Sequence, residues 1–199
     1  MIKIGITGGI GSGKSIVSNL FRIHGIPVYS ADEETKKLNN SSPIIKEQLT
    51  EHFGDNLYVN NVLNKKMFAD IIFNDSEKLQ LANSIIHPEV LKHFTYWCSQ
   101  NSEHSIVALE AAILFESGFN KHLDKVVTVY SPLKDRISRV SLRDNMSAEM
   151  VKDRIKNQMP EKEKIGLTEY VIVNDYNNSL IEQVHNLIDD IIHSSISSQ

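Results

Sequence analysis

The stretch Ile4-Gly5-Ile6-Thr7-Gly8-Gly9-Ile10-Gly11-Ser12-Gly13-Lys14-Ser15 indicates the fold of this chain. Residues 2–7 are mostly apolar and β-branched, which is typical of a buried parallel strand. Residues 8–15 fit the pattern G-x-x-x-x-G-K-[ST]. Apolar residues then follow at helical spacing, namely Ile16, Val17, Leu20, Phe21 and Ile23. Strand, glycine loop and helix therefore come in the order that a phosphate-binding loop requires.

The spacing of this motif has a chemical reason. Glycines let the backbone approach an anion closely, so that successive N–H groups point at phosphate oxygens near the positive end of the following helix. We expect Lys14 to reach the β- and γ-phosphates and the Ser15 hydroxyl to bind Mg²⁺. The alternative is an ordinary glycine-rich turn, but the Lys-Ser pair and the flanking elements favour a nucleotide triphosphate site.

Composition narrows the class of protein. The chain has 199 residues, 41% of them hydrophobic and 23% charged, as in a soluble globular domain with or without an inserted subdomain. A net charge of −4 gives no reason to expect nucleic-acid binding, and no apolar run reaches the roughly 20 residues of a membrane helix. Cys98 is the only cysteine, and the first strand begins at once, leaving no room for a signal peptide. We expect a cytoplasmic protein, monomeric or weakly homo-oligomeric, with no membrane partner.

A second strand is predicted at residues 27–30, and Asp32 follows its carboxyl end. In open α/β sheets, ligands bind beyond the carboxyl ends of the strands, so Asp32 could face the phosphate loop. Asp32 could equally be a helix N-cap or a first-turn acid favoured by the helix dipole. Position alone leaves both interpretations open.

Residues 39–103 carry helical patterns and no clear strand pattern. We predict helices over 43–53, 64–73 and 76–87, and another that opens at Pro88, with a turn at Asn60-Asn61. His87 would lie in the corner between two helices and support local structure. So long a helical stretch indicates an inserted subdomain that forms the second wall of a substrate cleft.

The second half of the chain continues the α/β alternation. A strand at 105–109 ends in Glu110, an acid placed to hold Mg²⁺ directly or through water, while Glu116 either contacts substrate or is merely exposed. Further strands are predicted at 125–130 and 169–173, helices from 133, over 147–159 and over 179–192, and a frayed tail over 193–199. The loop at Asn174 would lie where an adenine ring packs.

Arginines recur on the helix after residue 133, at Arg136, Arg139 and Arg143. Such residues beside a phosphate loop can form a lid that neutralises a transferring phosphoryl group. The alternative is a solvated helix face with local ion pairs, for example Arg143 with Asp144. For the group we favour the lid.

The expected fold is α/β: a three-layer P-loop NTPase core with a parallel sheet, an inserted helical substrate-binding subdomain and a helical lid. We expect a single domain over 1–199. Its parts would be the core (1–38, 104–134, 166–199), the insert (39–103) and the lid (135–165).

Several motifs together resemble those of the dephospho-CoA kinase family. They are Thr7 to Ser15, Ala31-Asp32, His87-Pro88, Leu114 to Gly118, Arg143-Asp144 and Arg154-Ile155 through Gln158-Met159-Pro160. The resemblance covers residues 2 to about 175. It implies that ATP phosphorylates the ribose 3′-hydroxyl of dephospho-CoA in the last step of coenzyme A synthesis, with a nucleotide core, a CoA domain and a lid.

The resemblance also implies residue roles. Asp32 would be the base, Arg139 and Arg143 the lid cations, and ATP would bind at Gly11, Ser12, Gly13, Lys14, Ser15 and Ile16. The chain departs from the family pattern at Ser30, where an Asp is usual, and at Ile16, where a second hydroxyl residue is usual. Glu110 and Ala112 likewise stand where Asp and Pro are usual.

Three other functions compete with this one. Another small-molecule P-loop kinase, acting on a nucleotide, shikimate or gluconate, fits the loop but not the long insert or the Gln-Met-Pro motif. A GTP-dependent switch needs D-x-x-G after a strand and [NT]-K-x-D, and the chain has neither. An inactive scaffold is disfavoured while Lys14, Ser15 and Asp32 are all present.

Overall fold

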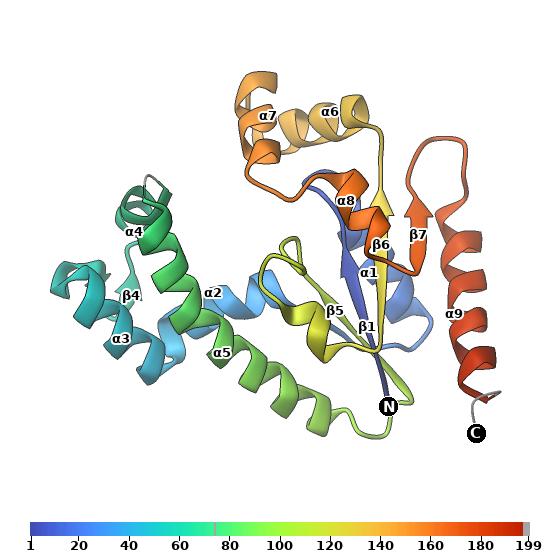
Figure 1. Ribbon diagram of the computed structural model, residues 1–199, viewed down its shortest axis with the longest axis horizontal. Coiled ribbons are helices and arrows are strands. Elements are labelled where there is room, and N and C mark those ends of the chain that lie inside the picture. Colours follow the sequence, from blue (N-terminus) through green and yellow to red (C-terminus); the bar gives the residue numbers. More distant parts are fainter. Residues whose placement is uncertain (74, 197–199) are drawn as a thin grey trace. The chain divides into compact units, whose positions relative to one another are not determined.

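The computed structural model describes residues 1–73 and 75–196 and divides the chain into two compact units. The first unit comprises residues 1–29 and 101–199, and the second comprises residues 30–100. A five-stranded sheet organises the first unit, in the order β2-β5-β1-β6-β7 (Figure 1). Its strands are β1 (Ile2–Thr7), β2 (Val28–Ser30), β5 (Ile106–Glu110), β6 (Lys125–Tyr130) and β7 (Tyr170–Val173).

The pairing of the strands places the loop after β1 in the middle of the sheet. Both β5 and β6 run parallel to β1, and β7 runs parallel to β6. The loop therefore follows a strand that has a neighbour on each side. In open parallel sheets, ligands bind at this carboxyl end of the strands.

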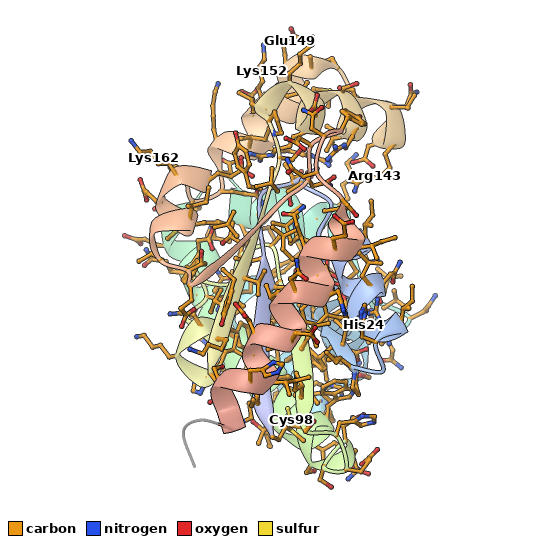
Figure 2. All side chains as sticks on the ribbon, turned by 90° about the vertical axis from the view of Figure 1, so that its right-hand side faces the viewer. His24, Cys98, Arg143, Glu149, Lys152 and Lys162 are labelled. Carbon is orange, nitrogen blue, oxygen red and sulfur yellow. The ribbon has the colours of Figure 1, made fainter. Side chains whose placement is uncertain are left out.

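One face of the sheet is covered by α1 (Lys14–Ile23) and α9 (Leu180–Ile196). Alternate strand residues point to this face and pack against both helices in one buried cluster, which includes Ile4, Ile6, Val127 and Ile172 together with Val17, Phe21, Val184 and Ile188. Figure 2 shows α9 along this side with His24 labelled near it, and the His24 ring stacks on that of His185 at 5.8 Å. The inward-facing residues of the strands and the apolar faces of α1 and α9 therefore form a single core.

The opposite face is closed by the segment after β5. A Cβ atom added at Gly5 would lie 2.9 Å from Leu114 and 2.7 Å from Leu123, so these side chains pack directly on the sheet. The short helices η2 (Phe119–His122) and α8 (Glu161–Gly166) follow in this region, and α8 contacts β6. The first unit is thus a three-layer α/β core, as predicted.

The predicted lid segment contains α6 (Leu133–Asp144), α7 (Ala148–Lys156) and α8. Asn145 ends α6 in the left-handed conformation, with φ of 51°, and the Ser147 hydroxyl caps α7 by accepting from the Met150 N–H at 3.3 Å. The predicted helix over 147–159 is too long, because α7 ends at Lys156. The short helix α8 was not predicted.

The second unit is mostly helical. It contains α2 (Ala31–Ser41), α3 (Pro43–Phe53), η1 (Asp55–Leu57), α4 (Lys65–Phe73) and α5 (Ser76–Gln100). Two polar side chains cap helices of this unit: Ser42 Oγ accepts from Ile45 N at 3.3 Å and Asn64 Oδ1 accepts from Met67 N at 3.2 Å. The expected insert over 39–103 overlaps this unit, which begins earlier, at Ser30.

This unit also contains a small hairpin, although its sequence shows no clear strand pattern. The strands β3 (Tyr58–Val59) and β4 (Val62–Leu63) pair antiparallel around the Asn60-Asn61 turn. Both asparagines have positive φ, 51° and 65°, the conformation that a two-residue hairpin turn requires. The turn was predicted, but strands of two residues are too short to show a sequence period.

The helix α5 corrects a second prediction. It continues through Pro88, where the sequence predicted a corner between two helices. Proline removes one backbone donor and crowds the preceding turn, which costs about 3 kcal/mol in an isolated helix. Here Ile85 and Ile86 before the proline and Val90 and Phe94 after it are all buried, and α5 packs on α2, α3 and α4. Packing of the residues on both sides of Pro88 therefore keeps α5 a single continuous helix.

The C-terminal helix also extends further than predicted. The structure shows α9 through Ile196, so residues 193–196 are helical rather than part of a frayed tail, and 197–199 lie outside the described residues. Across the described chain, no helix combines the length and apolar character needed to cross a membrane.

Candidate active site

The phosphate loop spans residues 8–13, between β1 and α1. The Ser12 N–H donates to the Gly9 carbonyl at 3.1 Å, and the Ile16 N–H donates to the Gly13 carbonyl at 3.0 Å. Gly13 has φ of 98°, a left-handed conformation that L side chains rarely adopt. At a helix N-terminus the first N–H groups lie where an anion can accept from them. The loop thus ends in a helix N-terminus suited to an anion.

Lys14 is the first residue of α1, and its side chain folds over this loop. Its Nζ donates to the Gly8 carbonyl at 3.0 Å and to the Gly9 carbonyl at 3.4 Å. The ammonium group therefore already lies at the rim of the cradle that the glycines form. A positive charge beside a helix N-terminus favours a strongly anionic ligand.

Ser15 and Glu110 lie side by side where α1 begins and β5 ends. Ser15 Oγ is 3.4 Å from one oxygen of the Glu110 carboxylate, and Ser18 Oγ donates to the other at 3.1 Å. A hydroxyl and a carboxylate are hard oxygen ligands of the kind Mg²⁺ prefers. Among the described residues, no cluster of three or more His, Cys, Asp or Glu side chains could hold a metal. The Ser15 hydroxyl and the Glu110 carboxylate are chemically suited to hold a Mg²⁺ ion.

Asn174, which the sequence places in a loop beside an adenine ring, contacts the phosphate loop. The residue is 7% exposed, and its Nδ2 donates to the Ser12 carbonyl at 2.7 Å. A Cβ atom at Gly13 would collide with the same Nδ2 atom. The loop and the end of β7 therefore fit together only because residue 13 is glycine.

Arg139 joins the same elements from α6. Its Nη1 donates to Ser131 Oγ at 3.0 Å and to the Gly11 carbonyl at 3.3 Å, and its Nη2 donates to the Asn174 carbonyl at 3.3 Å. Its guanidinium also lies 5.4 Å from the centre of the Tyr176 ring. This predicted lid cation thus lies at the phosphate loop itself.

Arg143 lies further along α6 and is exposed (Figure 2). Its Nε and Nη2 atoms contact the two oxygens of Asp144 at 2.7 and 2.9 Å, and Arg154 contacts the same carboxylate at 3.6 Å. The hydrogen bond with Asp144 raises the pKa of Arg143 and lowers that of Asp144. The local ion pair that the sequence offered as the alternative is therefore present.

Arg136 behaves differently from its two neighbours on α6. Its side chain is 4% exposed and forms an ion pair with Glu161 of α8. Its Nε donates to the Ile10 carbonyl of the phosphate loop at 2.9 Å. Sequence spacing placed Arg136 with the lid cations but contained no sign of this partner, which lies on another helix.

Glu116, whose role the sequence left open, is bound within the protein. Its carboxylate lies 3.1 Å from the Nζ of Lys164, a fully buried lysine that also donates to the Ala112 carbonyl at 2.7 Å. The Met159 N–H donates to Glu116 as well, at 3.0 Å. Glu116 therefore anchors the end of the predicted lid segment, at Met159 and Lys164.

Asp32 belongs to the helical unit and lies in the first turn of α2. Ser30 occupies the N-cap position, so the N-cap interpretation of Asp32 is wrong and the first-turn interpretation is right. The carboxylate is exposed. An acid there is stabilised by the helix dipole and remains accessible to a ligand.

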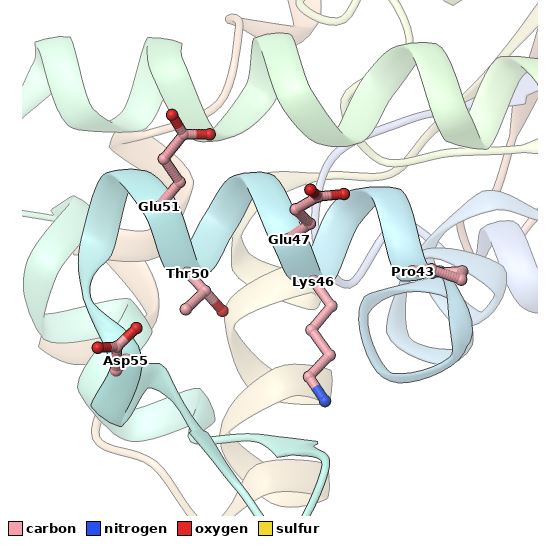
Figure 3. Close-up of a pocket in the computed structure, with 6 residues that line it drawn as sticks. All are labelled: Pro43, Lys46, Glu47, Thr50, Glu51 and Asp55. Atoms are coloured by element: carbon pink, nitrogen blue, oxygen red, sulfur yellow. The ribbon is translucent and has the colours of Figure 1, made fainter.

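The helical unit also has an open groove along α3 (Figure 3). Lys46 and Thr50 leave α3 on one side and Glu47 and Glu51 on the other. The Lys46 ammonium is engaged with Asn61 Oδ1. With Asp55 also lining it, the groove is predominantly acidic and poorly suited to a phosphate-bearing ligand.

Taken together, the central parallel strand, the glycine loop and the helix that opens with Lys14 and Ser15 define a P-loop protein of the small-molecule kinase type. The shikimate kinase of Acinetobacter baumannii has the same fold, with a TM-score of 0.53 at 14% identity over 98% of this chain and 94% of that one. The profile described as dephospho-CoA kinase matches residues 2–180, and the chain belongs to this family.

Individual relatives agree over nearly the whole chain. The dephospho-CoA kinase of Bacteroides fragilis is 44% identical over 187 residues, 94% of this chain and 91% of the relative. That of Porphyromonas gingivalis is 42% identical over 193 residues, 96% and 95% of the two chains. The crystal structure of TT1252 from Thermus thermophilus has a TM-score of 0.84 at 34% identity, covering 94% of this chain and 95% of that one. The resemblance inferred from the motifs is confirmed.

Proposed function

We propose that this protein transfers the γ-phosphoryl group of ATP to the ribose 3′-hydroxyl of dephospho-CoA and releases coenzyme A and ADP. The observation that carries this proposal is the family match over residues 2–180, which includes every predicted site residue. The geometry of the phosphate loop supports the donor half of the reaction. The acceptor half rests on the family and on the position of Asp32.

On the donor side, residues 11–16 would bind ATP. Backbone N–H groups at the start of α1 would meet phosphate oxygens, and Lys14 would turn from the Gly8 carbonyl toward the β- and γ-phosphates. Ile16, 54% exposed, lacks the usual hydroxyl and would contribute only its backbone. Asn174 would contribute by holding the loop beneath the nucleotide.

Ser15 and Glu110 would hold Mg²⁺, the first through its hydroxyl and the second directly or through water. The ion would neutralise charge on the β- and γ-phosphates. Glu is one methylene longer than the usual Asp, and its contacts with Ser15 and Ser18 show that the carboxylate reaches the start of α1.

Asp32 would orient the acceptor hydroxyl and accept its proton late in an in-line transfer. With serine at position 30, Asp32 is the one acid of the Ser30-Ala31-Asp32 motif. Arg139 and Arg143 would neutralise the charge that develops on the transferring group. Arg143 would have to exchange its Asp144 partner for phosphate oxygens.

The test is ATP consumption by the purified protein with dephospho-CoA as the acceptor, compared with shikimate, gluconate and a nucleoside monophosphate. We expect efficient turnover with dephospho-CoA only, a product phosphorylated at the 3′ position of the ribose, and loss of activity when Mg²⁺ is chelated. Turnover of another acceptor at a higher rate would overturn the proposal.

A further inference from the structure

Side chains from residues far away in the sequence contact the backbone of the phosphate loop. Gln158 and Arg136 both hydrogen-bond to Ile10, and Gln158 belongs to the motif Gln158-Met159-Pro160. The proposed reaction gives the motif no role, since none of its groups serves as a base, a lid cation or a metal ligand.

Gln158 holds the loop through its amide oxygen. The Ile10 N–H donates to Gln158 Oε1 at 2.9 Å, across 148 residues of sequence. Because the Ile10 N–H donates to Gln158, it does not point toward a bound phosphate. The contact therefore selects one orientation of the peptide that precedes Ile10.

The Arg136–Glu161 pair holds the next peptide of the loop, through the Ile10 carbonyl. Arg136 Nε donates to the Ile10 carbonyl at 2.9 Å, and its Nη1 forms the ion pair with the Glu161 carboxylate. The side chains are 4% and 13% exposed, so both charges depend on each other for solvation. A Cβ atom at Gly9 would collide with the Arg136 guanidinium, which therefore lies directly against the loop backbone.

The segment that carries Gln158 and Glu161 is itself anchored. Glu116 accepts from the Met159 N–H at 3.0 Å and contacts the buried Lys164 ammonium at 3.1 Å. Lys164 also donates to the Ala112 carbonyl, two residues after Glu110. Contacts on both sides of Pro160 thus fix this segment to the part of the chain that follows β5.

We propose that Gln158 and the Arg136–Glu161 pair are positioning residues that set the conformation of Gly9 and Ile10 and thereby prepare the loop to bind the phosphates of ATP. The inference rests on the proposed use of ATP at this loop. None of the three side chains needs to touch the nucleotide. Their effect is to fix the outward-facing groups of the loop, so that the remaining N–H groups are presented together without reorganisation on binding.

The test compares ATP binding at equilibrium and steady-state KM values in Gln158→Ala and in the double variant Arg136→Gln/Glu161→Gln. The double variant removes both charges together, because loss of one would leave the other buried and unpaired and could unfold the protein. We expect each to weaken ATP binding about tenfold, the size of one or two lost hydrogen bonds. The KM for dephospho-CoA should stay within about twofold of the wild-type value.

Asn40→Ala is the matched control. Asn40 Oδ1 accepts from the Leu63 N–H at 2.8 Å in the helical unit, so its loss also removes an amide-to-backbone contact but leaves the phosphate loop untouched. We expect wild-type ATP binding in this variant. The inference is overturned if Gln158→Ala and the double variant, both folded by circular dichroism, bind ATP as wild type does. It is equally overturned if the KM values for both substrates rise by the same factor. Failure of the wild-type protein to bind ATP would instead refute the proposed function.

Discussion

At the scale of single residues, the site residues differ in how firmly their surroundings fix them. Lys14 and Arg139 contact carbonyl groups of the phosphate loop, and Asn174 is buried beneath it. Asp32 and Arg143 are exposed, and Arg143 pairs with Asp144. The groups proposed to bind the donor are thus preorganised, whereas those proposed to act on the transferring group remain free to respond to substrates.

Replacement of Asp32 by Asn should lower kcat by about 10² to 10⁴-fold, because the amide cannot accept the proton of the acceptor hydroxyl. The KM for ATP should change little, since the carboxylate belongs to the helical unit and not to the phosphate loop. The measurement is steady-state kinetics with both substrates varied. Glu33→Gln, the next exposed acid in the same turn of α2, is the control and should keep wild-type turnover. Near-normal turnover in Asp32→Asn would falsify the assignment of the base.

His87 should make stability depend on pH. Burial disfavours the charged imidazolium and lowers the pKa of His87 below its usual 6.5 in the folded protein. As the pH falls, the unfolded chain takes up a proton first, so stability is full above pH 6.5 and is lost as the pH falls from 6.5 toward the lowered pKa.

The free energy of unfolding in urea should therefore fall less between about pH 7.5 and about pH 5.5 in His87→Gln than in the wild-type protein. The acids with lowered pKa values, Asp75, Asp144 and Asp175, titrate below this range and do not contribute to the difference. An identical fall in both proteins would contradict the prediction.

At the scale of elements, three segments contact the phosphate loop. Side chains from α6, from Gln158 before α8 and from the residue after β7 all hydrogen-bond to its backbone. The strand-loop-helix unit is local in sequence, but its stability comes from segments more than a hundred residues away. Changes within the loop should therefore affect the whole first unit.

Gly13→Ala should destabilise the protein more than Gly25→Ala does. Both glycines have positive φ, 98° and 75°, so each alanine incurs the cost of a left-handed conformation, about 1 kcal/mol. At Gly25 nothing lies within 4 Å of the new Cβ, whereas at Gly13 the Cβ displaces Asn174 from the Ser12 carbonyl. Loss of that buried hydrogen bond adds roughly 1–3 kcal/mol. Urea unfolding measures the difference, and equal values for the two variants would show that Asn174 does not support the loop.

At the scale of the whole molecule, the chain divides into a unit that contains the phosphate loop and a unit that contains Asp32. The proposed reaction assigns the donor to the first and the acceptor to the second. The first boundary between the units falls between Tyr29 and Ser30, at the end of β2, and α2 begins directly afterwards at Ala31.

Hydrogen exchange should distinguish the two units. ATP with Mg²⁺ should slow exchange of amides in residues 8–15 and around Gln158, because ligand binding suppresses local opening. Dephospho-CoA alone should slow exchange mainly within residues 30–100. The outer turns of α9, distant in sequence from both regions, serve as an internal reference. Protection of the first unit alone by both ligands would contradict the assignment of the helical unit to the acceptor.

Much of the fold follows from local sequence. The strand at 125–130 and the helix at 43–53 have the predicted bounds, because a β-branched run and a Ser-Pro start with a glycine stop are local signals. Two elements could not be predicted in this way. The helix α5 continues through Pro88 because the residues around the proline are buried, and the strands of the β3–β4 hairpin are too short to show a period.

The sequence by itself determined the phosphate loop, the parallel core around it, the family, and the candidate residues Lys14, Ser15 and Asp32. Only the tertiary structure decided what the remaining polar residues bind: Arg136 pairs with Glu161, Gln158 with Ile10, and Glu116 with Lys164. The physical reason is distance along the chain. A motif is recognisable when its chemistry is made by neighbouring residues, whereas partners up to 148 residues apart leave no periodicity or spacing and meet only when the sheet and the lid helices have packed.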